Sequence, residues 1–173
     1  MAFLECGFRR FHVRGWDQLR ERLLAHGGVA MVPQKEPEEH VRVLLRDGEL
    51  FEPRKITLDP GEPNQCHANC ARLWAWGPEG RQLATGYALC AEGLWRQHSW
   101  LWHPGRREIV ETTSRSEKYF GAVLEGPFAL GFIWANAPEL QEPGSVPEAL
   151  LPLIAKVLEE NPESGRPVAR RGK

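Results

Sequence analysis

A predicted helix followed directly by three strand-like segments is the feature that most constrains the fold of this chain of 173 residues. The helix spans residues 65–76, where apolar side chains recur at helical spacing until Gly77-Pro78 ends the pattern. The strand-like segments lie at approximately 83–91, 95–102 and 107–113. Short connections favour antiparallel pairing of consecutive strands, so we predict an α+β domain in which the helix packs on an antiparallel β-sheet.

The segments outside this core carry weaker patterns. Residues 17–26 predict a short amphipathic helix, with Asp17 as its N-cap and Gly27-Gly28 as its left-handed end. Residues 41–53 predict a β-hairpin, because Asp47-Gly48 suits a type I′ turn between two apolar runs. Further expected elements are a strand at 29–32, a strand near 128–134 and a helix from about 145 to 160.

The length of the chain suits one domain with a full-sized hydrophobic core. We expect a single domain over 1–160, with 1–60 as an N-terminal helix and hairpin region and 61–135 as the core that carries the chemistry. Residues 161–173 are polar, contain proline and end in basic residues, which predicts a disordered tail.

Charge and hydropathy exclude several partners. The net charge of −1 gives no electrostatic reason to expect nucleic acid or an anionic membrane as the main partner. No apolar run approaches the roughly 18 residues of a membrane span. The N-terminal segment also lacks the long apolar core of a signal peptide. We therefore expect a cytoplasmic protein with reduced thiols at its four cysteines, Cys6, Cys66, Cys70 and Cys90.

Cys66 lies at the predicted start of the helix, directly after Pro63-Asn64-Gln65. With Asn64 as the N-cap, Cys66 occupies the first turn, where unpaired backbone N–H groups and the helix dipole favour a thiolate over a thiol. The same N–H groups are suited to hold the oxyanion of a tetrahedral intermediate. Cys66 is therefore the predicted nucleophile. Cys70, four residues later on much the same helical face, is predicted to be a core thiol.

His98 and Glu111 fall on the second and third predicted strands. A two-residue turn at Pro104-Gly105, or a four-residue loop at 103–106, places them directly opposite each other, whereas a three-residue loop breaks this pairing. Opposed residues share a sheet face, with Cβ atoms about 4.5–5.5 Å apart. Glu111 is then able to accept a hydrogen bond from one imidazole nitrogen and leave the other nitrogen facing the Cys66 thiol.

The order of these motifs resembles a known superfamily. Cys66 at a helix start is followed by His98-Ser99-Trp100 and then by Glu111-Thr112-Thr113. This arrangement is similar to the papain-like and transglutaminase-like cysteine hydrolase superfamily, whose comparable motifs are approximately His-Ala-Trp and Asp-Pro-Thr. Small uncharacterised bacterial and phage proteins of this kind are also similar over about residues 62–122. Glu111 stands where the superfamily has Asp or Asn.

The resemblance implies a Cys66-His98-Glu111 triad and acyl transfer through a thioester, without a cofactor. The implied activities are those of a peptidase, deamidase, amidase or transglutaminase, acting on a peptide, a protein or an amide-containing small molecule. Asn64 or Gln65 is expected to supply the side-chain oxyanion donor. Two further residues, Trp100 and Trp102, share a strand face with His98, so one of them is expected to wall the site.

Two other functions stay open at the level of sequence. The first is a catalytically inactive relative that binds a peptide, protein or small ligand through a tryptophan-lined cleft. The second is a zinc site, for which the available ligand types are Cys66, His67, Cys70, Cys90 and His103. Zinc is the weaker of the two, because two cysteines four residues apart within one helix do not have zinc-finger spacing. We therefore predict no metal.

Overall fold

The structure, a computed structural model, describes residues 15–33, 38–77, 80–142 and 144–160. Within these ranges, five α-helices and a curled, mostly antiparallel seven-stranded sheet confirm the predicted mixed α+β class. Cys6 and the tail expected at 161–173 lie outside the described residues.

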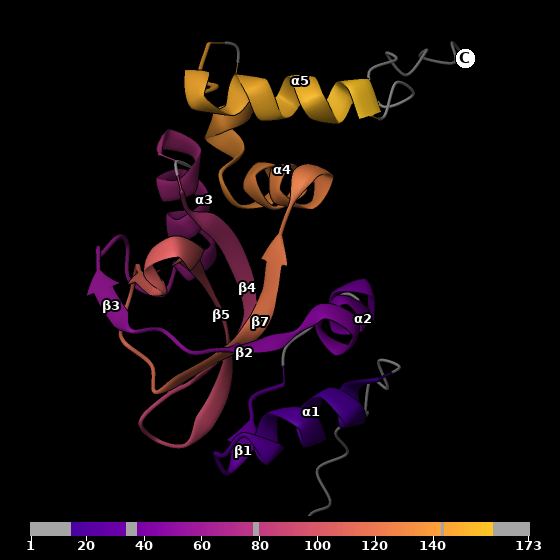
Figure 1. The fold of residues 1–173 in the computed structure, drawn as a ribbon, viewed down its shortest axis with the longest axis vertical. Coiled ribbons are helices and arrows are strands. Elements are labelled where there is room, and N and C mark those ends of the chain that lie inside the picture. Colours follow the sequence, from indigo (N-terminus) through magenta and orange to yellow (C-terminus); the bar gives the residue numbers. More distant parts are fainter. Residues whose placement is uncertain (1–14, 34–37, 78–79, 143, 161–173) are drawn as a thin grey trace, which may run out of the picture.

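Helices and strands are mixed in the first half of the chain, β4 to β7 then follow one another, and the described part ends in helices. The helices are α1 (Trp16–Ala25), α2 (Glu38–Asp47), α3 (Cys66–Trp76), α4 (Gly126–Asn136) and α5 (Leu151–Glu160). The strands are β1 (Ala30–Met31), β2 (Glu49–Phe51), β3 (Lys55–Leu58), β4 (Gln82–Leu89), β5 (Leu94–His103), β6 (Glu108–Glu111) and β7 (Lys118–Leu124). Short 3-10 helices span Pro104–Arg106, Pro138–Gln141 and Glu148–Leu150. Figure 1 shows α1 and α2 at one end of the sheet and α4 and α5 at the other.

The strand order is β2-β7-β4-β5-β6-β3, and β1 pairs with β5 off this path. The predicted meander is confirmed, since β4 pairs antiparallel with β5 and β5 pairs antiparallel with β6. The β1–β5 and β3–β6 pairs are parallel. Both ends of the strand order, β2 and β3, come from the N-terminal region, which is thus an integral part of the sheet.

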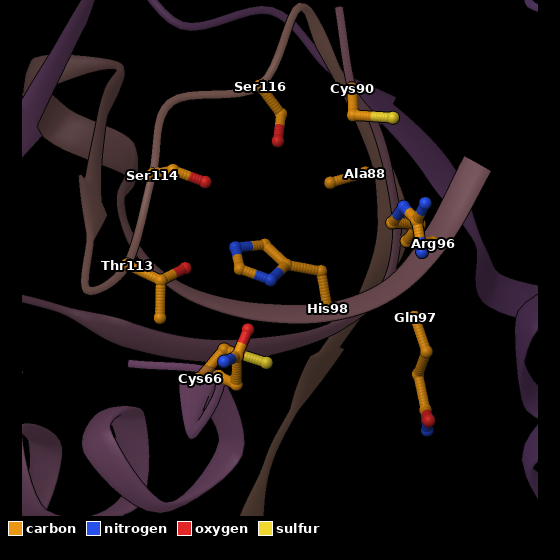
Figure 2. A pocket seen from close by; sticks show the side chains of 10 residues that line it. Cys66, Ala88, Cys90, Arg96, Gln97, His98, Thr113, Ser114 and Ser116 are labelled. Carbon is orange, nitrogen blue, oxygen red and sulfur yellow. The ribbon is translucent and has the colours of Figure 1, made fainter. Parts of the chain in front are cut away.

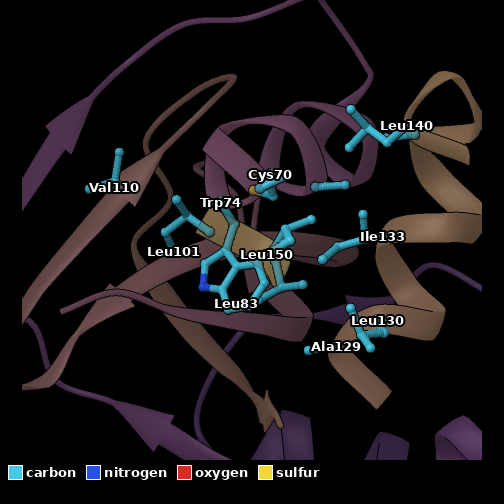
Figure 3. Close-up of a cluster of buried hydrophobic side chains, with 13 residues drawn as sticks. Cys70, Trp74, Leu83, Leu101, Val110, Ala129, Leu130, Ile133, Leu140 and Leu150 are labelled. Carbon is cyan, nitrogen blue, oxygen red and sulfur yellow. The ribbon is translucent and has the colours of Figure 1, made fainter. Parts of the chain in front are cut away.

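The two faces of β4 have different roles. Leu83 packs in a cluster between the sheet, α3 and α4 (Figure 3), and Tyr87 packs in a second cluster with α1 and α2. These odd-numbered positions share one face of the strand. The opposite face, which carries Ala84, packs with the fully buried Trp100 and Tyr119 in a third cluster. The candidate site is built on the face that carries Ala84, because His98 pairs with Gly86 on the same face.

The predicted hairpin at 41–53 is wrong, because its first half is helix α2. Val41 and Leu44 are both fully buried, and residues three apart share a helical face but not a strand face. The N–H of Gly48 donates to the C=O of Leu44 at 3.0 Å, so the Asp-Gly dipeptide ends a helix and does not form a hairpin turn. Only the second half of the segment is extended, as β2.

The strand predicted near 128–134 is also wrong, because these residues lie in helix α4. Ala129 and Ile133, four residues apart, are buried against the cluster that includes α3. Pro127 stands within the first two helical positions, where its missing N–H costs nothing. The extended segment of this region is β7, which lies earlier in the chain.

Helix α1 confirms the helix predicted at 17–26, with a different start. Its N-cap is Gly15, at φ 89°, and Asp17 lies in the first turn without a capping hydrogen bond. Gly27 and Gly28 have φ of 112° and 84°, which confirms the left-handed end expected there.

Candidate active site

Helix α3 begins at Cys66, but without the expected cap. Gln65 is the N-cap and makes no side-chain capping bond, while Asn64 has φ 60°, so the prediction of Asn64 as the N-cap is wrong. Asparagine tolerates this left-handed conformation better than most residues do. The loop before the helix is held instead by the side chain of Asn69. Its Oδ1 accepts from the backbone N–H of Glu62 at 3.1 Å, and its Nδ2 donates to the backbone C=O of Glu62 at 2.8 Å.

The first turn of α3 lies where β5 and β6 part. Leu101 is the β5 residue at which pairing with β6 stops. Beyond this point α3 contacts both β5 and the segment that follows β6. Nδ1 of His67 lies 2.6 Å from Oγ of Ser99 on β5, and Nδ2 of Asn69 donates to the C=O of Thr112, just after β6, at 3.4 Å. The helix start is therefore fixed between the middle of β5 and the end of β6.

The loop that enters α3 is tied to the strand that carries Glu111. The N–H of Asp59 donates to the backbone C=O of Glu111 at 2.8 Å, and the N–H of Gly61 donates to that of Thr112 at 2.9 Å. A Cβ on Gly61 would lie 2.5 Å from the side chain of Asn69, so any larger residue would have to displace Asn69 from its hydrogen bonds. These bonds bring the start of α3 beside the end of β6.

Cys66 is a half-buried free thiol that is hydrogen-bonded to His98, and Figure 2 shows it below the imidazole ring. Burial by itself raises the pKa of the thiol. The hydrogen bond and charge of His98 and the backbone N–H groups of Ser99 and His67 outweigh burial, so the pKa of Cys66 is lowered. The lowering is therefore due mainly to His98, and the start of the helix contributes the N–H of His67.

His98 links Cys66 to Glu111. Its Nε2 lies 2.8 and 2.9 Å from the two carboxylate oxygens of Glu111, which leaves Nδ1 for the thiol. Burial lowers the pKa of His98, but hydrogen bonds and charges of Cys66 and Glu111 outweigh it and raise the pKa to about 9. A thiolate facing an imidazolium is the state that these opposite shifts favour.

Glu111 is fully buried and accepts from several donors besides His98. Its Oε1 accepts from the backbone N–H groups of Thr112 at 2.9 Å and Thr113 at 3.3 Å, and from the Thr113 hydroxyl at 3.4 Å. Its Oε2 accepts from the hydroxyl of Tyr119 at 3.0 Å. A carboxylate at zero exposure requires such a set of donors, and this set fixes its orientation toward the imidazole.

The predicted strand register is wrong, although the residues it joined do meet. His103 pairs with Glu108 around a loop that ends at Arg107, one residue later than expected. Continued along the strands, this register would set His98 opposite position 113, not Glu111. A shift of two residues keeps each side chain on its own face, because the strand period is two. His98 and Glu111 therefore meet diagonally at the point where the strands part.

Beside Cys66 and His98 lies a pocket of about 240 Å³. Its lining residues are Asn64, Cys66, Ala88, Cys90, Arg96, Gln97, His98, Thr113, Ser114 and Ser116. Figure 2 shows the His98 ring at the centre, with Thr113 and Ser114 on one side and Arg96 on the other. Most of the lining residues have polar side chains, and they include both Cys66 and His98, so a molecule bound in this pocket would lie against these two side chains.

Of the predicted oxyanion and wall residues, only Asn64 lines the pocket. Gln65 is exposed at the helix cap. Trp100 is fully buried, with its ring 6.3 Å from that of His98 in a stacked arrangement, and it supports the imidazole from within the protein. Trp102 packs edge-on to Phe51 at 5.3 Å. No tryptophan is among the residues that line this pocket.

The other two cysteines of the described residues, Cys70 and Cys90, differ from each other in burial and position. Cys70 is fully buried, as predicted for a core thiol, and burial is the main reason that its pKa is raised. Cys90 lies after β4 at the pocket rim, and its sulfur donates to the C=O of Leu94 at 3.1 Å. Across the part of the chain that the structure describes, no group of three or more His, Cys, Asp or Glu side chains is placed to hold a metal ion.

Several residues that hold the site together escape sequence reasoning. Asn69 and the His67–Ser99 pair fix the helix start, and Tyr119 fixes Glu111. The available signals are indirect. Asn69 is a polar residue on the buried side of a helix, and Ser99 is the polar position between His98 and a tryptophan. A buried polar residue requires a partner, but the sequence does not say which one.

Comparison of the chain with models of known protein families, with curated proteins and with solved structures gave no match. In the described segments, no helix has the length and apolar character needed to cross a membrane.

Proposed function

We propose that this protein is a cysteine-dependent amide hydrolase or acyltransferase of the peptidase, deamidase or transglutaminase type, with a papain-like core. The observation that carries the proposal is the position of His98, which bonds Glu111 through Nε2 at 2.8 Å and faces the Cys66 thiol with its other nitrogen. The opposite pKa shifts of Cys66 and His98 support an ion pair, which is the activated form of such a nucleophile.

The reaction follows from this geometry. The Cys66 thiolate attacks the carbonyl carbon of an amide, and the C=O π electrons move onto oxygen to give a tetrahedral oxyanion. As the oxyanion collapses, the C–N bond breaks and the His98 imidazolium gives its proton to the leaving amine. Water or a second amine then loses a proton to His98 and attacks the thioester carbon, which releases the acyl product and restores the thiolate. Glu111 keeps the imidazole oriented throughout.

The oxyanion requires donors near Cys66. The backbone N–H of Cys66 lies in the first turn of α3, where helix geometry provides no internal partner for it. Asn64 lines the same pocket and offers a side-chain amide. We assign these two groups to the oxyanion, in a place comparable to the donors of cysteine hydrolases.

Interception of the thioester tests the proposal without a known substrate. A library of short N-acylated peptides and carboxamides is incubated with the protein and hydroxylamine, which converts a thioester R–CO–S–Cys66 into the hydroxamate R–CO–NHOH and frees the thiol. Mass spectrometry is expected to find hydroxamates with the wild type and with Cys90→Ser, but not with Cys66→Ser. Equal products with Cys66→Ser, or none with any form, would contradict the enzyme assignment and favour a binding module.

A further inference from the structure

The residues that line the pocket include an arginine, Arg96. We propose that Arg96 binds a carboxylate of the substrate close to the scissile bond, so that this site acts on amides that carry an anionic group. This inference rests on the function proposed above, because it names the substrate class of the same pocket.

Arg96 is placed by the strand that places His98. The two residues are two apart on β5 and therefore project from the same face of the sheet. Both line the pocket, and Figure 2 shows Arg96 beside Ala88 on the side away from Thr113. A group bound next to the Cys66–His98 pair is therefore within the same small space as the guanidinium.

The charge of Arg96 is not neutralised within the pocket. None of the ten lining residues is Asp or Glu. The imidazolium of His98 is bonded to the buried Glu111 and faces the Cys66 thiolate, so Arg96 is the cation of the lining that remains available to an anionic group. Over the described ranges, no salt bridge within 4.0 Å involves Arg96. Glu92 interacts with it electrostatically, but the main contact of Glu92 is with the Cys90 thiol.

The facing wall of the pocket adds donors for an anion. Thr113, Ser114 and Ser116 carry hydroxyls there, and Figure 2 shows Ser114 and Ser116 across the pocket from Arg96. The volume of about 240 Å³ lies below the roughly 300–1,000 Å³ of pockets for drug-sized ligands, so one small group fits. A planar carboxylate matches the two parallel donors of a guanidinium.

Two alkylating agents that differ in charge test this inference without a natural substrate. Iodoacetate and iodoacetamide both form a Cys66 S–CH₂ bond and release iodide, but only iodoacetate carries a carboxylate. Second-order rate constants at Cys66 are measured by peptide mapping at low ionic strength for the wild type, Arg96→Gln and Arg20→Gln. Arg20 is an exposed arginine on α1 and is not part of the pocket, so it controls for the change in net charge.

Arg96→Gln is expected to lower the iodoacetate rate constant about five- to tenfold, the scale of one nearby charge in a partly solvated site. The iodoacetamide rate constant is expected to stay within about twofold, and Arg20→Gln is expected to leave both unchanged. An unchanged ratio of the two rate constants in Arg96→Gln would overturn the inference while leaving the proposed function intact. Wild-type Cys66 that reacts no faster than Cys90 with either reagent would overturn both.

Protection experiments separate the two sources of a carboxylate. N-acetyl-Ala-Glu-amide presents a side-chain carboxylate, N-acetyl-Ala-Ala presents a terminal carboxylate, and N-acetyl-Ala-Gln-amide presents neither. One of the two anionic peptides is expected to slow alkylation of wild-type Cys66 by iodoacetamide, and Arg96→Gln is expected to abolish this protection. Equal protection by the neutral peptide, or protection that persists in Arg96→Gln, would contradict a carboxylate site at Arg96.

Discussion

At the scale of single residues, the fully buried carboxylate of Glu111 is the feature of the site that costs most free energy to remove from water. It has zero exposure and is bonded by His98, by two backbone N–H groups and by the hydroxyls of Thr113 and Tyr119. An acidic side chain is rarely fully buried unless its burial is compensated by donors of this kind. This buried carboxylate therefore fixes the orientation of the His98 imidazole.

Glu111→Gln is expected to keep the shape of the site and remove the charge. Without the carboxylate the pKa of His98 falls from about 9 and the pKa of the Cys66 thiol rises, because each charge stabilises the other. For each unit by which the thiol pKa rises, the thiolate fraction well below that pKa falls about tenfold. Alkylation of Cys66 at pH 6 measures this loss. Glu108→Gln, at the other end of β6, is the matched control and is expected to have no effect on Cys66.

Tyr119→Phe removes one donor from the same carboxylate. Burial and the neighbouring Glu111 raise the pKa of the phenol, so it stays protonated and donates its hydrogen to Glu111. The loss of a hydrogen bond to a charged group is expected to lower the free energy of unfolding by about 1.5–3 kcal/mol, measured by urea denaturation. A variant as stable as the wild type would show that the Tyr119 hydroxyl does not support Glu111.

At the scale of secondary-structure elements, strand faces were predictable from the sequence and the exact position of a loop along the chain was not. The alternation along β5 and β6 placed His98 and Glu111 on a common face, and that placement survives a register shift of two residues. The shift arises because the loop ends at Arg107 with φ 47°, a conformation that arginine seldom adopts and that its sequence does not signal. In the same way, a strong turn dipeptide at Asp47-Gly48 obscured the helical spacing of α2.

Asn69→Ala tests how the start of α3 is held. This side chain is nearly buried and joins the loop at Glu62 to the helix, so its removal leaves partly buried backbone groups without partners. We expect a loss of about 1–3 kcal/mol in the free energy of unfolding and slower alkylation of Cys66. Gln65→Ala, at the exposed cap without a capping bond, is expected to stay within about 0.5 kcal/mol. Similar losses in the two variants would contradict this account of the loop.

Gly121 and Gly131 are predicted to respond in opposite ways to alanine. A Cβ at Gly121 on β7 would lie 2.5 Å from the C=O of Thr85 and 2.6 Å from the Trp100 ring that supports His98. Overpacking there is expected to cost about 1–3 kcal/mol. A Cβ at Gly131 in α4 meets nothing within 4 Å, so Gly131→Ala is expected to stabilise the protein by about 0.5–1 kcal/mol. Thermal and urea unfolding of both variants check the two signs.

At the scale of the whole molecule, the site depends on chain segments that lie far apart in the sequence. β3, from the N-terminal region, runs parallel to β6 as far as Glu111, and the chain then passes directly into the loop that ends at Cys66. Cys66 and Glu111 are thus joined through one edge of the sheet, while His98 comes from the meander. The sequence predicted the meander and the helix, but parallel pairing of β3 with β6 depends on long-range contacts that local patterns do not encode.

The central claim is that Cys66 and His98 form a thiolate–imidazolium pair, and the pH dependence of Cys66 alkylation by iodoacetamide tests it most directly. The lowered thiol pKa means that the reactive form is lost only when the pH falls through that lowered value, and the raised pKa of His98 means that the imidazolium is lost as the pH rises through about 9. We predict that at pH 6 Cys66 reacts at least about tenfold faster than Cys90 in the same molecule, and that His98→Gln removes this advantage. Equal rates for the two cysteines at pH 6, or an advantage that persists in His98→Gln, would contradict the ion pair.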